Sequence, residues 1–386
     1  MIGRRLAAGA IAAVIAGVLA APAPALDNGL ARTPPMGWSS WYPLRCQVNE
    51  QVVRETAHAM IASGMRAAGY RYVNLDDCWM ARTRRRGQLR PDPAKFPHGM
   101  RALAAYLHRR GLKLGIYAAA GRATCMRFPG SRRHLYTDAR TFASWRVDYL
   151  KLDGCFTTRR ERGPQGYGVM QSAIRWTRHP MVLSISAWGL ESPWVWAANV
   201  GHLWRTTPDI HARWSSMMRI VDHNAGLAGH ARPGAWNDPD MLQVGNRGLR
   251  TTEGKSMFSL WSMMAAPLIA GNDLRAMSRT TRGILTNREV IAVDQDPAGV
   301  QGFRASSVGG HEVWIRPLAS GDRALLLVNR SRARAMLGAD ARQLGLRPSR
   351  GYVVRDLWLH RTSTTPGPVT AFLPAHGVAM FRVRSG

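Results

Sequence analysis

The stretch that decides the fold is Val147–Cys155, which reads Val-Asp-Tyr-Leu-Lys-Leu-Asp-Gly-Cys. Its apolar residues predict a buried strand, and parallel strands covered on both faces are nearly all apolar. Lys151 and Asp153 are two residues apart, so their side chains point to the same face of that strand. At the C-terminal end of a barrel strand this face is the active-site mouth. We expect the ammonium to keep the carboxylate ionised, as a nucleophile requires; a structural ion pair explains this stretch equally well.

Short apolar stretches alternate with amphipathic helical segments from residue 35 to about 275. Including Val147–Cys155, the predicted strands are Met36–Trp41, Tyr70–Trp79, Leu112–Ala120, Val147–Cys155, Met181–Trp188, His202–Asp209, Ala235–Leu242 and Met263–Asn272. Between the first two, Val53, Ala57, Met60 and Ile61 recur on one face of a helix. Eight such units predict a (β/α)₈ TIM barrel. A doubly wound open sheet would show a glycine-rich phosphate turn after its first strand, and the sequence has none.

The pattern changes after residue 294. Four short β-rich stretches separated by turns with Gly, Pro, Ser and Asp predict a C-terminal antiparallel β-sandwich packed on the barrel. We therefore divide the chain into a signal peptide at 1–25, a catalytic α/β barrel at 26–294 and an antiparallel β domain at 295–386.

The N-terminus has the three parts of a secretory signal: paired arginines, an Ala-rich apolar run and an Ala-x-Ala cleavage site ending at Ala25. The run is too short to span a bilayer, and no other stretch of the chain could do so. The sequence thus predicts a secreted or periplasmic protein with no membrane attachment after signal removal.

The formal net charge is +29, and only four of the 53 Lys and Arg residues are lysine. The arginines are spread along the chain, and no nucleic-acid-binding motif accompanies their densest cluster near Arg84. A solvated basic surface explains them better than a nucleic-acid partner. Adhesion to anionic polysaccharide is a secondary property that such a surface would have.

Four cysteines in an exported protein predict two disulfides. Cys46 and Cys78 follow the first two predicted strands, and Cys125 and Cys155 follow the next two. Since neighbouring barrel strands lie side by side, we expect Cys46–Cys78 and Cys125–Cys155 bonds at the rim of the mouth.

Carboxylates gather where the predicted strands end, and aromatic residues accompany them. The acids are Asp76, Asp77, Asp153, Asp209, Asp238 and Asp240, and the aromatics are Trp38, Trp41, Trp79, Tyr117, Trp188, Trp204 and Trp236. Paired acids with flat rings are typical of a sugar site. Each isolated aspartate could instead cap a helix, but capping explains poorly why acids follow four strands of one barrel face. No Cys or His spacing indicates a metal site, and we expect neither a metal nor a cofactor.

Several motifs resemble the α-galactosidases, or melibiases, of glycoside hydrolase family twenty-seven. They are Thr-Pro-Pro-Met-Gly-Trp-Ser-Ser-Trp at 33–41, Asn-Leu-Asp-Asp-Cys-Trp at 74–79, Leu-Gly-Ile-Tyr at 114–117, Tyr-Leu-Lys-Leu-Asp-Gly-Cys at 149–155, Trp-Asn-Asp-Pro-Asp-Met-Leu at 236–242, and the segments 265–274 and 290–296. The resemblance runs through the mature chain. It implies a retaining exo-glycosidase that releases terminal α-D-galactose from an oligo- or polysaccharide without a cofactor.

The resemblance also implies roles for individual residues. Asp153 matches the nucleophile and Asp209 the acid/base, so we expect their carboxyl groups about 5–5.5 Å apart. Asp76 and Asp77 match the pair that selects the galacto configuration. The remaining expected substrate contacts are Trp41, Tyr117, Lys151, Ser186, Ala187, Trp188, Arg205 and Asp240.

The sequence departs from the family where Ser186-Ala187-Trp188 replaces Cys-Glu-Trp, and where Ala119 replaces an acid. If Ala187 lies near the 2-position of the sugar, its small size favours a bulkier 2-substituent. α-N-Acetylgalactosaminidase is therefore the main alternative activity, followed by β-L-arabinopyranosidase. A catalytically inactive glycan- or polyanion-binding protein is a more distant alternative, and the sequence leaves the oligomeric state open.

Overall fold

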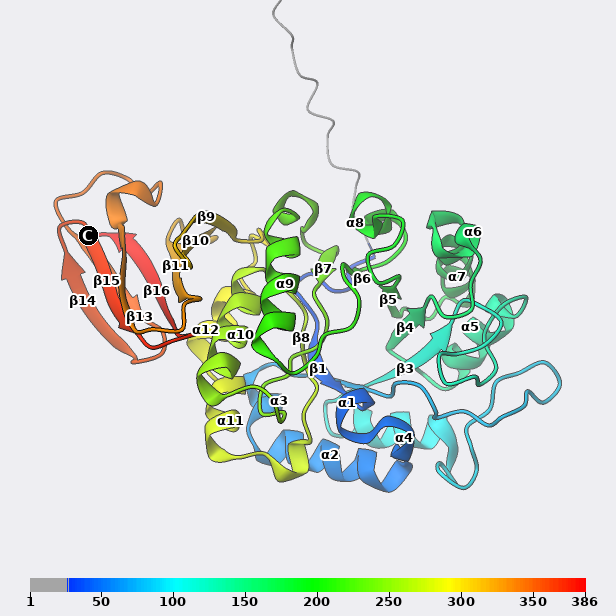
Figure 1. Ribbon diagram of the computed structural model, residues 1–386. Coiled ribbons are helices and arrows are strands. Elements are labelled where there is room, and N and C mark those ends of the chain that lie inside the picture. Colours follow the sequence, from blue (N-terminus) through cyan, green and yellow to red (C-terminus); the bar gives the residue numbers. More distant parts are fainter. Residues whose placement is uncertain (1–25, 27) are drawn as a thin grey trace, which may run out of the picture.

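The computed structural model describes Leu26 and residues 28–386, so the predicted signal peptide lies outside the described residues. An α/β unit is followed by a smaller all-β unit at the C-terminal end (Figure 1). No helix of the described residues is long and apolar enough to cross a membrane.

The α/β unit is built on eight parallel strands in the order β7-β6-β5-β4-β3-β2-β1-β8. The sheet closes on itself through a parallel bridge between Leu242 and Ala270, where the Leu242 amide donates to the Ile269 carbonyl at 2.7 Å. The strands are β1 Met36–Ser39, β2 Tyr72–Asn74, β3 Lys113–Ala119, β4 Tyr149–Asp153, β5 Val182–Ser186, β6 Leu203–Arg205, β7 Trp236–Asp238 and β8 Leu268–Ala270. This sheet confirms the predicted TIM-barrel fold.

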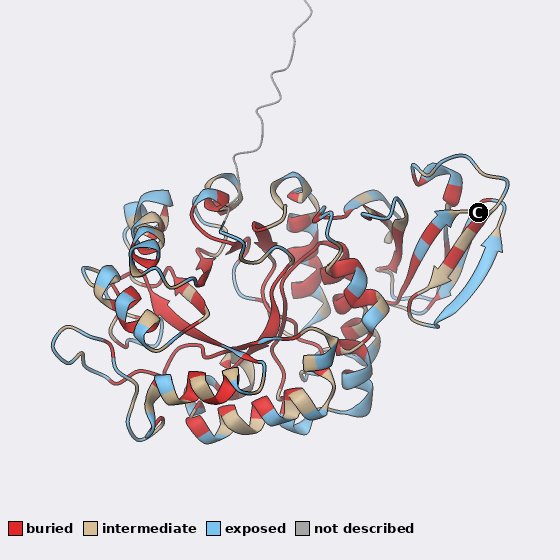
Figure 2. Ribbon diagram, turned by 180° about the vertical axis from the view of Figure 1, so that it is seen from behind, coloured by how far each residue is buried: buried red, intermediate tan, exposed pale blue. Residues whose placement is uncertain are grey.

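Helices surround the sheet and bury one face against it (Figures 1 and 2). In α2, for example, Val53, Ala57 and Met60 are fully buried, as their spacing predicts. The helices are α1 Trp41–Leu44, α2 Glu50–Ala62, α3 Met65–Ala68, α4 Gly99–His108, α5 Leu135–Ser144, α6 Arg159–Arg162, α7 Pro164–Thr177, α8 Pro193–Trp196, α9 Trp214–Ala225, α10 Thr251–Met263, α11 Arg279–Leu285 and α12 Arg288–Asp294. Short 3₁₀ turns lie at Arg45–Gln47, Ala197–Asn199, Ala228–His230, Leu274–Ala276 and Ala341–Gln343.

The observed strands are shorter than the predicted ones, and two predicted ends are helical. Trp41 begins α1 rather than ending β1, because the Ser39 hydroxyl accepts the Trp41 amide and the chain turns there. Met263 ends α10, and Pro267 separates that helix from β8 because proline cannot continue the turn. The residues cut from the C-terminal strand ends, such as 75–79 after β2 and 206–209 after β6, lie in the loops of the barrel mouth.

The C-terminal unit is a six-stranded antiparallel sheet in the order β14-β13-β16-β11-β10-β9, with a two-stranded sheet, β12-β15, beside it. These strands are β9 Phe303–Val308, β10 His311–Pro317, β11 Arg323–Asn329, β12 Ala335–Asp340, β13 Tyr352–Asp356, β14 Arg361–Thr365, β15 Pro368–Leu373 and β16 Val378–Ser385. This arrangement confirms the expected antiparallel β-sandwich.

Strand β11 is buried on both faces because it lies between two apolar cores. Leu325 and Leu327 pack into the core of the β unit, while Leu326 and Val328 belong to the core that it shares with the barrel. Arg316 is also fully buried at this junction and donates to the carbonyls of Ser262 and Asp294. The β unit therefore shares its core with the outer barrel helices and closes no part of the mouth.

Candidate active site

A cavity opens at the C-terminal ends of the barrel strands. It is lined by Trp41, Tyr42, Asp76, Asp77, Tyr117, Cys125, Lys151, Asp153, Trp188, Arg205, Asp209, Asp240 and Met241. A second small cavity beneath it reaches into the barrel and shares Asp76, Lys151, Arg205 and Asp240 with the first. Ten of the twelve predicted catalytic and substrate-binding residues thus line one cavity, although they come from strands far apart in the sequence.

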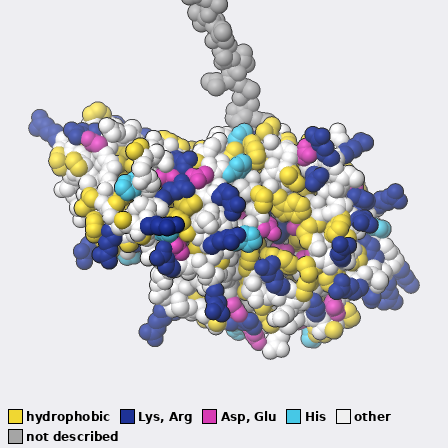
Figure 3. All heavy atoms as spheres, in the orientation of Figure 1, with side chains coloured by type: hydrophobic (Ala, Val, Ile, Leu, Met, Phe, Trp, Pro, Cys, Tyr) yellow, Lys and Arg dark blue, Asp and Glu magenta, His cyan; other side chains and the backbone are white. Residues whose placement is uncertain are grey.

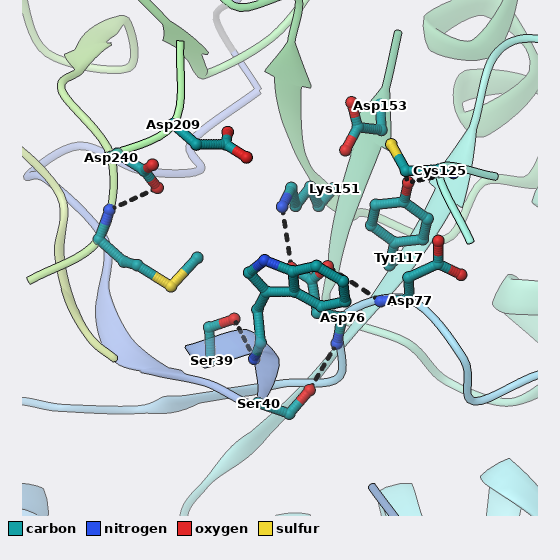
Figure 4. Close-up of polar contacts among 12 residues, drawn as sticks. Ser39, Ser40, Asp76, Asp77, Tyr117, Cys125, Lys151, Asp153, Asp209 and Asp240 are labelled. Carbon is teal, nitrogen blue, oxygen red and sulfur yellow. Dashed lines mark hydrogen bonds and ion pairs between the residues drawn. The ribbon is translucent and has the colours of Figure 1, made fainter. Parts of the chain in front are cut away.

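Lys151 forms its ion pair with a residue two strands away rather than along its own strand. Its Nζ lies 2.8 Å from Oδ2 of Asp76, which follows β2 (Figure 4). Burial alone would lower the pKa of Lys151, but Asp76 and then Asp153 raise it above its usual value. The lysine is therefore a permanent cation at the base of the cavity, held between two carboxylates.

Asp153 does not have the depressed pKa that its neighbour Lys151 led us to expect. The Asp153 side chain is buried, and burial raises its pKa to about 7, while Lys151 opposes the shift and Asp76 and Asp209 add to it. Its Oδ1 accepts the Gly154 amide at 2.8 Å. The expectation was wrong because desolvation of a buried carboxylate outweighs one ammonium that is already shared with Asp76.

Asp76 and Asp77 point to different parts of the cavity wall. Asp76 receives Lys151, and its amide donates to the Ser40 hydroxyl at 2.9 Å. Asp77 instead accepts two backbone amides, Cys78 at 2.7 Å and Met126 at 2.9 Å. Burial nevertheless raises the pKa of Asp77 above its usual value. The pair thus offers one carboxylate held by a cation and another held by the neighbouring loop.

Arg205 at the end of β6 holds Asp209 and Asp240. These two carboxylates lie on the side of the cavity opposite Asp153 (Figure 4). Its Nη2 lies 3.0 Å from Oδ2 of Asp240 and 3.2 Å from Oδ1 of Asp209. Burial raises the pKa of Asp240 to about 6 against the effect of Arg205. The Asp209 side chain is 57% exposed. Although its partial burial works the other way, Arg205 and then Lys151 lower its pKa below the usual value.

Trp188 enters the cavity, whereas Ser186 and Ala187 do not line it. Ser186 and Ala187 are fully buried, and Ala187 packs in the main apolar core. The chain reverses immediately after them, because Trp188 has φ 54° and Gly189 has φ 81°. A side chain at Gly189 would meet the Thr206 carbonyl oxygen at 2.3 Å. This turn carries the indole to the cavity and leaves the two preceding residues outside its lining.

Three cavity residues were missed by the sequence interpretation: Tyr42, Cys125 and Met241. The Tyr42 hydroxyl donates to the carbonyl of Ile210, the residue after Asp209. Tyr42 follows Trp41 and Met241 follows Asp240, both of which were predicted contacts. This adjacency is the one feature of the sequence that could have predicted Tyr42 and Met241 as cavity residues. Four of the aromatics taken as candidates, Trp38, Trp79, Trp204 and Trp236, are fully buried and line neither of these two cavities.

Both predicted disulfides are present, Cys46–Cys78 and Cys125–Cys155, and they join neighbouring loops at the mouth. Cys125, Asp153 and Cys155 form the one cluster of potential metal ligands in the described part of the chain. Both sulfurs are in a disulfide, which removes the thiolates that would bind a metal.

Comparison with known proteins shows the relatives of the whole described chain. A family model described as α-galactosidase A matches residues 33–296, and one described as the α-galactosidase C-terminal β-sandwich domain matches 308–383. An α-galactosidase of Cyamopsis tetragonoloba is 46% identical over 362 residues, covering 92% of this chain and 87% of the relative. An α-N-acetylgalactosaminidase of Gallus gallus is 44% identical over 329 residues, covering 79% and 81%. The crystal structure of α-galactosidase I from Mortierella vinacea superimposes with a TM-score of 0.90 at 33% identity, covering 93% of this chain and 99% of that one.

Proposed function

The chain belongs to the α-galactosidase family of glycoside hydrolases, and on that premise we propose that it is a secreted exo-α-galactosidase that retains anomeric configuration. The single observation that carries the proposal is the cavity in which Asp153 and Asp209 lie on opposite walls, with Lys151 and Asp76 between them (Figure 4). A terminal sugar held there has one carboxylate on each side of its glycosidic bond, which is the arrangement that glycosidases use. Retention further requires the two carboxyl groups to be about 5–5.5 Å apart, leaving no room for a water between them and the sugar.

The proposed reaction has two steps. In the first, an oxygen of Asp153 attacks the anomeric carbon, the bond to the leaving oxygen breaks, and Asp209 gives that oxygen its proton. In the second, Asp209 takes a proton from water, the water oxygen attacks the anomeric carbon, and the ester to Asp153 breaks. Asp209 suits the role that exchanges protons with water, because its side chain is the exposed one of the two.

The remaining residues supply binding and charge. Asp76, Asp77 and Asp240 offer acceptors to sugar hydroxyls, and Trp41 and Tyr117 offer apolar ring faces. Lys151 and Arg205 offset the charge of the carboxylates around them. Secretion is supported by the signal sequence and by the two disulfides.

A panel of substrates tests the proposal. We expect kcat/KM to be highest for an aryl α-galactoside, compared with the corresponding α-N-acetylgalactosaminide and β-L-arabinopyranoside. The α-N-acetylgalactosaminide is the leading alternative substrate, because a relative of 44% identity is named an α-N-acetylgalactosaminidase. A higher kcat/KM for the N-acetyl sugar would replace the proposed substrate, and no hydrolysis of any of the three would favour a binding protein.

The roles of the two carboxylates are tested by azide. In Asp153→Gly, azide takes the place of the nucleophile and should give the inverted β-galactosyl azide. In Asp209→Ala, azide attacks the glycosyl-enzyme and should give the α-galactosyl azide. An α-azide from Asp153→Gly with a β-azide from Asp209→Ala would mean that the two residues have each other's roles. An α-azide from both variants would reject the covalent intermediate on Asp153.

A further inference from the structure

Exposed arginines border the cavity on two sides. On the first side, Cζ of Arg45 lies 4.6 Å from the ring centroid of Trp41 and 5.1 Å from that of Tyr42. Both rings line the cavity, and Arg45 itself is exposed beside Cys46 of the first disulfide. The guanidinium therefore stands at the entrance, over the aromatic wall that the sugar would contact.

On the second side, two arginines share one aromatic ring. Cζ of Arg122 lies 5.5 Å and Cζ of Arg127 lies 5.2 Å from the ring centroid of Phe156. Cys125, which lines the cavity, lies between these arginines in the sequence, and its disulfide partner precedes Phe156. Both arginines are exposed, so this wall of the cavity also carries cations on its outer edge.

None of these three guanidinium groups has a carboxylate partner within the described part of the chain. Other arginines of the neighbouring loops do: Arg84 pairs with Asp138 at 2.6 Å and Arg132 with Glu161 at 2.6 Å. Arg122 and Arg127 therefore place two unpaired cations at one edge of the cavity. The cation–π contacts hold them in place but do not neutralise them, so an anionic ligand would gain from both.

Negative side chains predominate inside the cavity, and positive side chains border its entrance. The cavity itself holds five aspartates against one lysine and one arginine. Figure 3 shows acidic side chains in the hollow at the centre of the barrel face, with Lys and Arg side chains around it. An anionic sugar would be repelled from the cavity, whereas a neutral sugar would fit there with an anionic group outside it.

We propose that the natural substrate is an acidic galactoside: a neutral terminal α-galactose in the cavity, linked to a sugar whose carboxylate or sulfate contacts Arg45 or the Arg122–Arg127 pair. This inference rests on the proposed function and specifies its substrate. An acidic polysaccharide with α-galactosyl ends would meet both sides of the rim, and the basic surface of the protein would attract it over longer distances.

The test compares two substrates that differ by one charge, α-galactosyl-(1→3)-glucuronic acid and its methyl ester. With galactose release as the readout, we expect kcat/KM for the acid to exceed that for the ester about three- to tenfold at low salt, as exposed ion pairs allow. The advantage should shrink at 0.5 M NaCl, because the Debye length falls to a few ångströms. A sulfated disaccharide of the same linkage tells whether the rim distinguishes sulfate from carboxylate.

Variants assign the effect to the rim. Arg45→Gln and the double variant Arg122→Gln/Arg127→Gln should each lose kcat/KM on the acid, while kcat/KM on the ester and on an aryl α-galactoside stays unchanged. Arg109→Gln is the matched control, since Arg109 is exposed at the end of α4, at the opposite end of the barrel.

Three results would overturn the inference: equal kcat/KM on acid and ester, a preference that salt does not weaken, or a preference that all the rim variants retain. Failure of the proposed function gives a different result, because the enzyme would then release galactose from none of the substrates, including the aryl α-galactoside.

Discussion

Replacing Asp209 by asparagine should remove the alkaline fall of the kcat/KM profile. The pH at which the remaining limb is half-maximal would then report the pKa of Asp153. In the proposed mechanism the first step requires ionised Asp153 and protonated Asp209. The raised pKa of Asp153, about 7, and the lowered pKa of Asp209 make this combination a minority of molecules at every pH. The kcat/KM profile should be bell-shaped, with a fall above pH 7 as the pair loses its last proton.

In Asp209→Asn only the ionisation of Asp153 remains. With an activated leaving group such as 2,4-dinitrophenolate, which needs no proton, kcat/KM should rise with pH and stay high where the native enzyme declines. The pH of half-maximal kcat/KM should lie below 7, because the carboxylate of Asp209 is one of the charges that raise the pKa of Asp153.

The size of that displacement follows from Coulomb's law. At a separation of about 5.5 Å and an effective dielectric constant of about 20, two charges interact by about 3 kcal/mol. Solvent reduces this value because the Asp209 side chain is 57% exposed, so we expect a displacement of about one pH unit. On a substrate with a poor leaving group, such as a methyl α-galactoside, the loss of the acid should cost about 10²–10⁴-fold.

The assay is stopped-flow release of dinitrophenol from pH 4 to 9 with substrate in excess, in which a burst equal to the enzyme concentration would report accumulation of a glycosyl-enzyme. Asp273→Asn, on the loop after β8, is a control for a general change in charge. The reasoning would be refuted by a variant profile that still falls above pH 7, because the alkaline limb would then belong to neither carboxylate.

Three further predictions concern the frame of the site. Tyr42→Phe removes the hydroxyl that holds the Ile210 carbonyl, so kcat should fall about three- to tenfold with KM nearly unchanged; an unchanged kcat would deny the tyrosine a positioning role. Each disulfide closes a loop of about 30 residues and should contribute about 3–4 kcal/mol to the free energy of unfolding, measured by urea unfolding with and without reductant; free thiols in the unfolded, non-reduced protein would contradict the pairing. Ala187→Glu buries an unpaired carboxylate and should lower the free energy of unfolding by about 3 kcal/mol or more, whereas a stable variant with raised kcat/KM would place residue 187 at the sugar.

The barrel and its rim could be predicted because they depend on local patterns and topology. An apolar run such as Val147–Cys155 predicts a buried strand whatever surrounds it. Once eight such runs are in order, parallel neighbours bring the strand ends together. The disulfide pairs follow from the same argument, since each joins loops of adjacent strands. These inferences needed the order of the elements and no side-chain geometry.

The electrostatics could not be predicted, because they depend on which charges meet across the barrel. Lys151 and Asp153 share a strand face, yet the lysine pairs with Asp76, which is 75 residues away in the sequence. A sequence also gives no measure of how completely a carboxylate is desolvated. That quantity decides the direction of the shift at Asp153, whose pKa is raised although a cation lies beside it.

The position of Ala187 outside the cavity lining has a different physical cause, which lies in backbone conformation. Strand alternation predicts that Ser186 and Trp188 share one face and Ala187 the other, but the strand ends at Ser186. Two consecutive residues with positive φ, Trp188 and Gly189, then reverse the chain. A positive φ is uncommon for a bulky residue such as tryptophan, so the sequence does not predict this conformation. The turn is fixed instead by contacts with β6, through the Gly189 amide on the Arg205 carbonyl at 3.1 Å. Because the same backbone of β6 continues into the Asp209 loop, the Trp188 indole and the Asp209 carboxylate are positioned by one pair of neighbouring strand ends. We therefore expect a substitution at Trp188, which lines the cavity, to change the ratio of kcat/KM on galactoside and N-acetylgalactosaminide more than any substitution at Ala187.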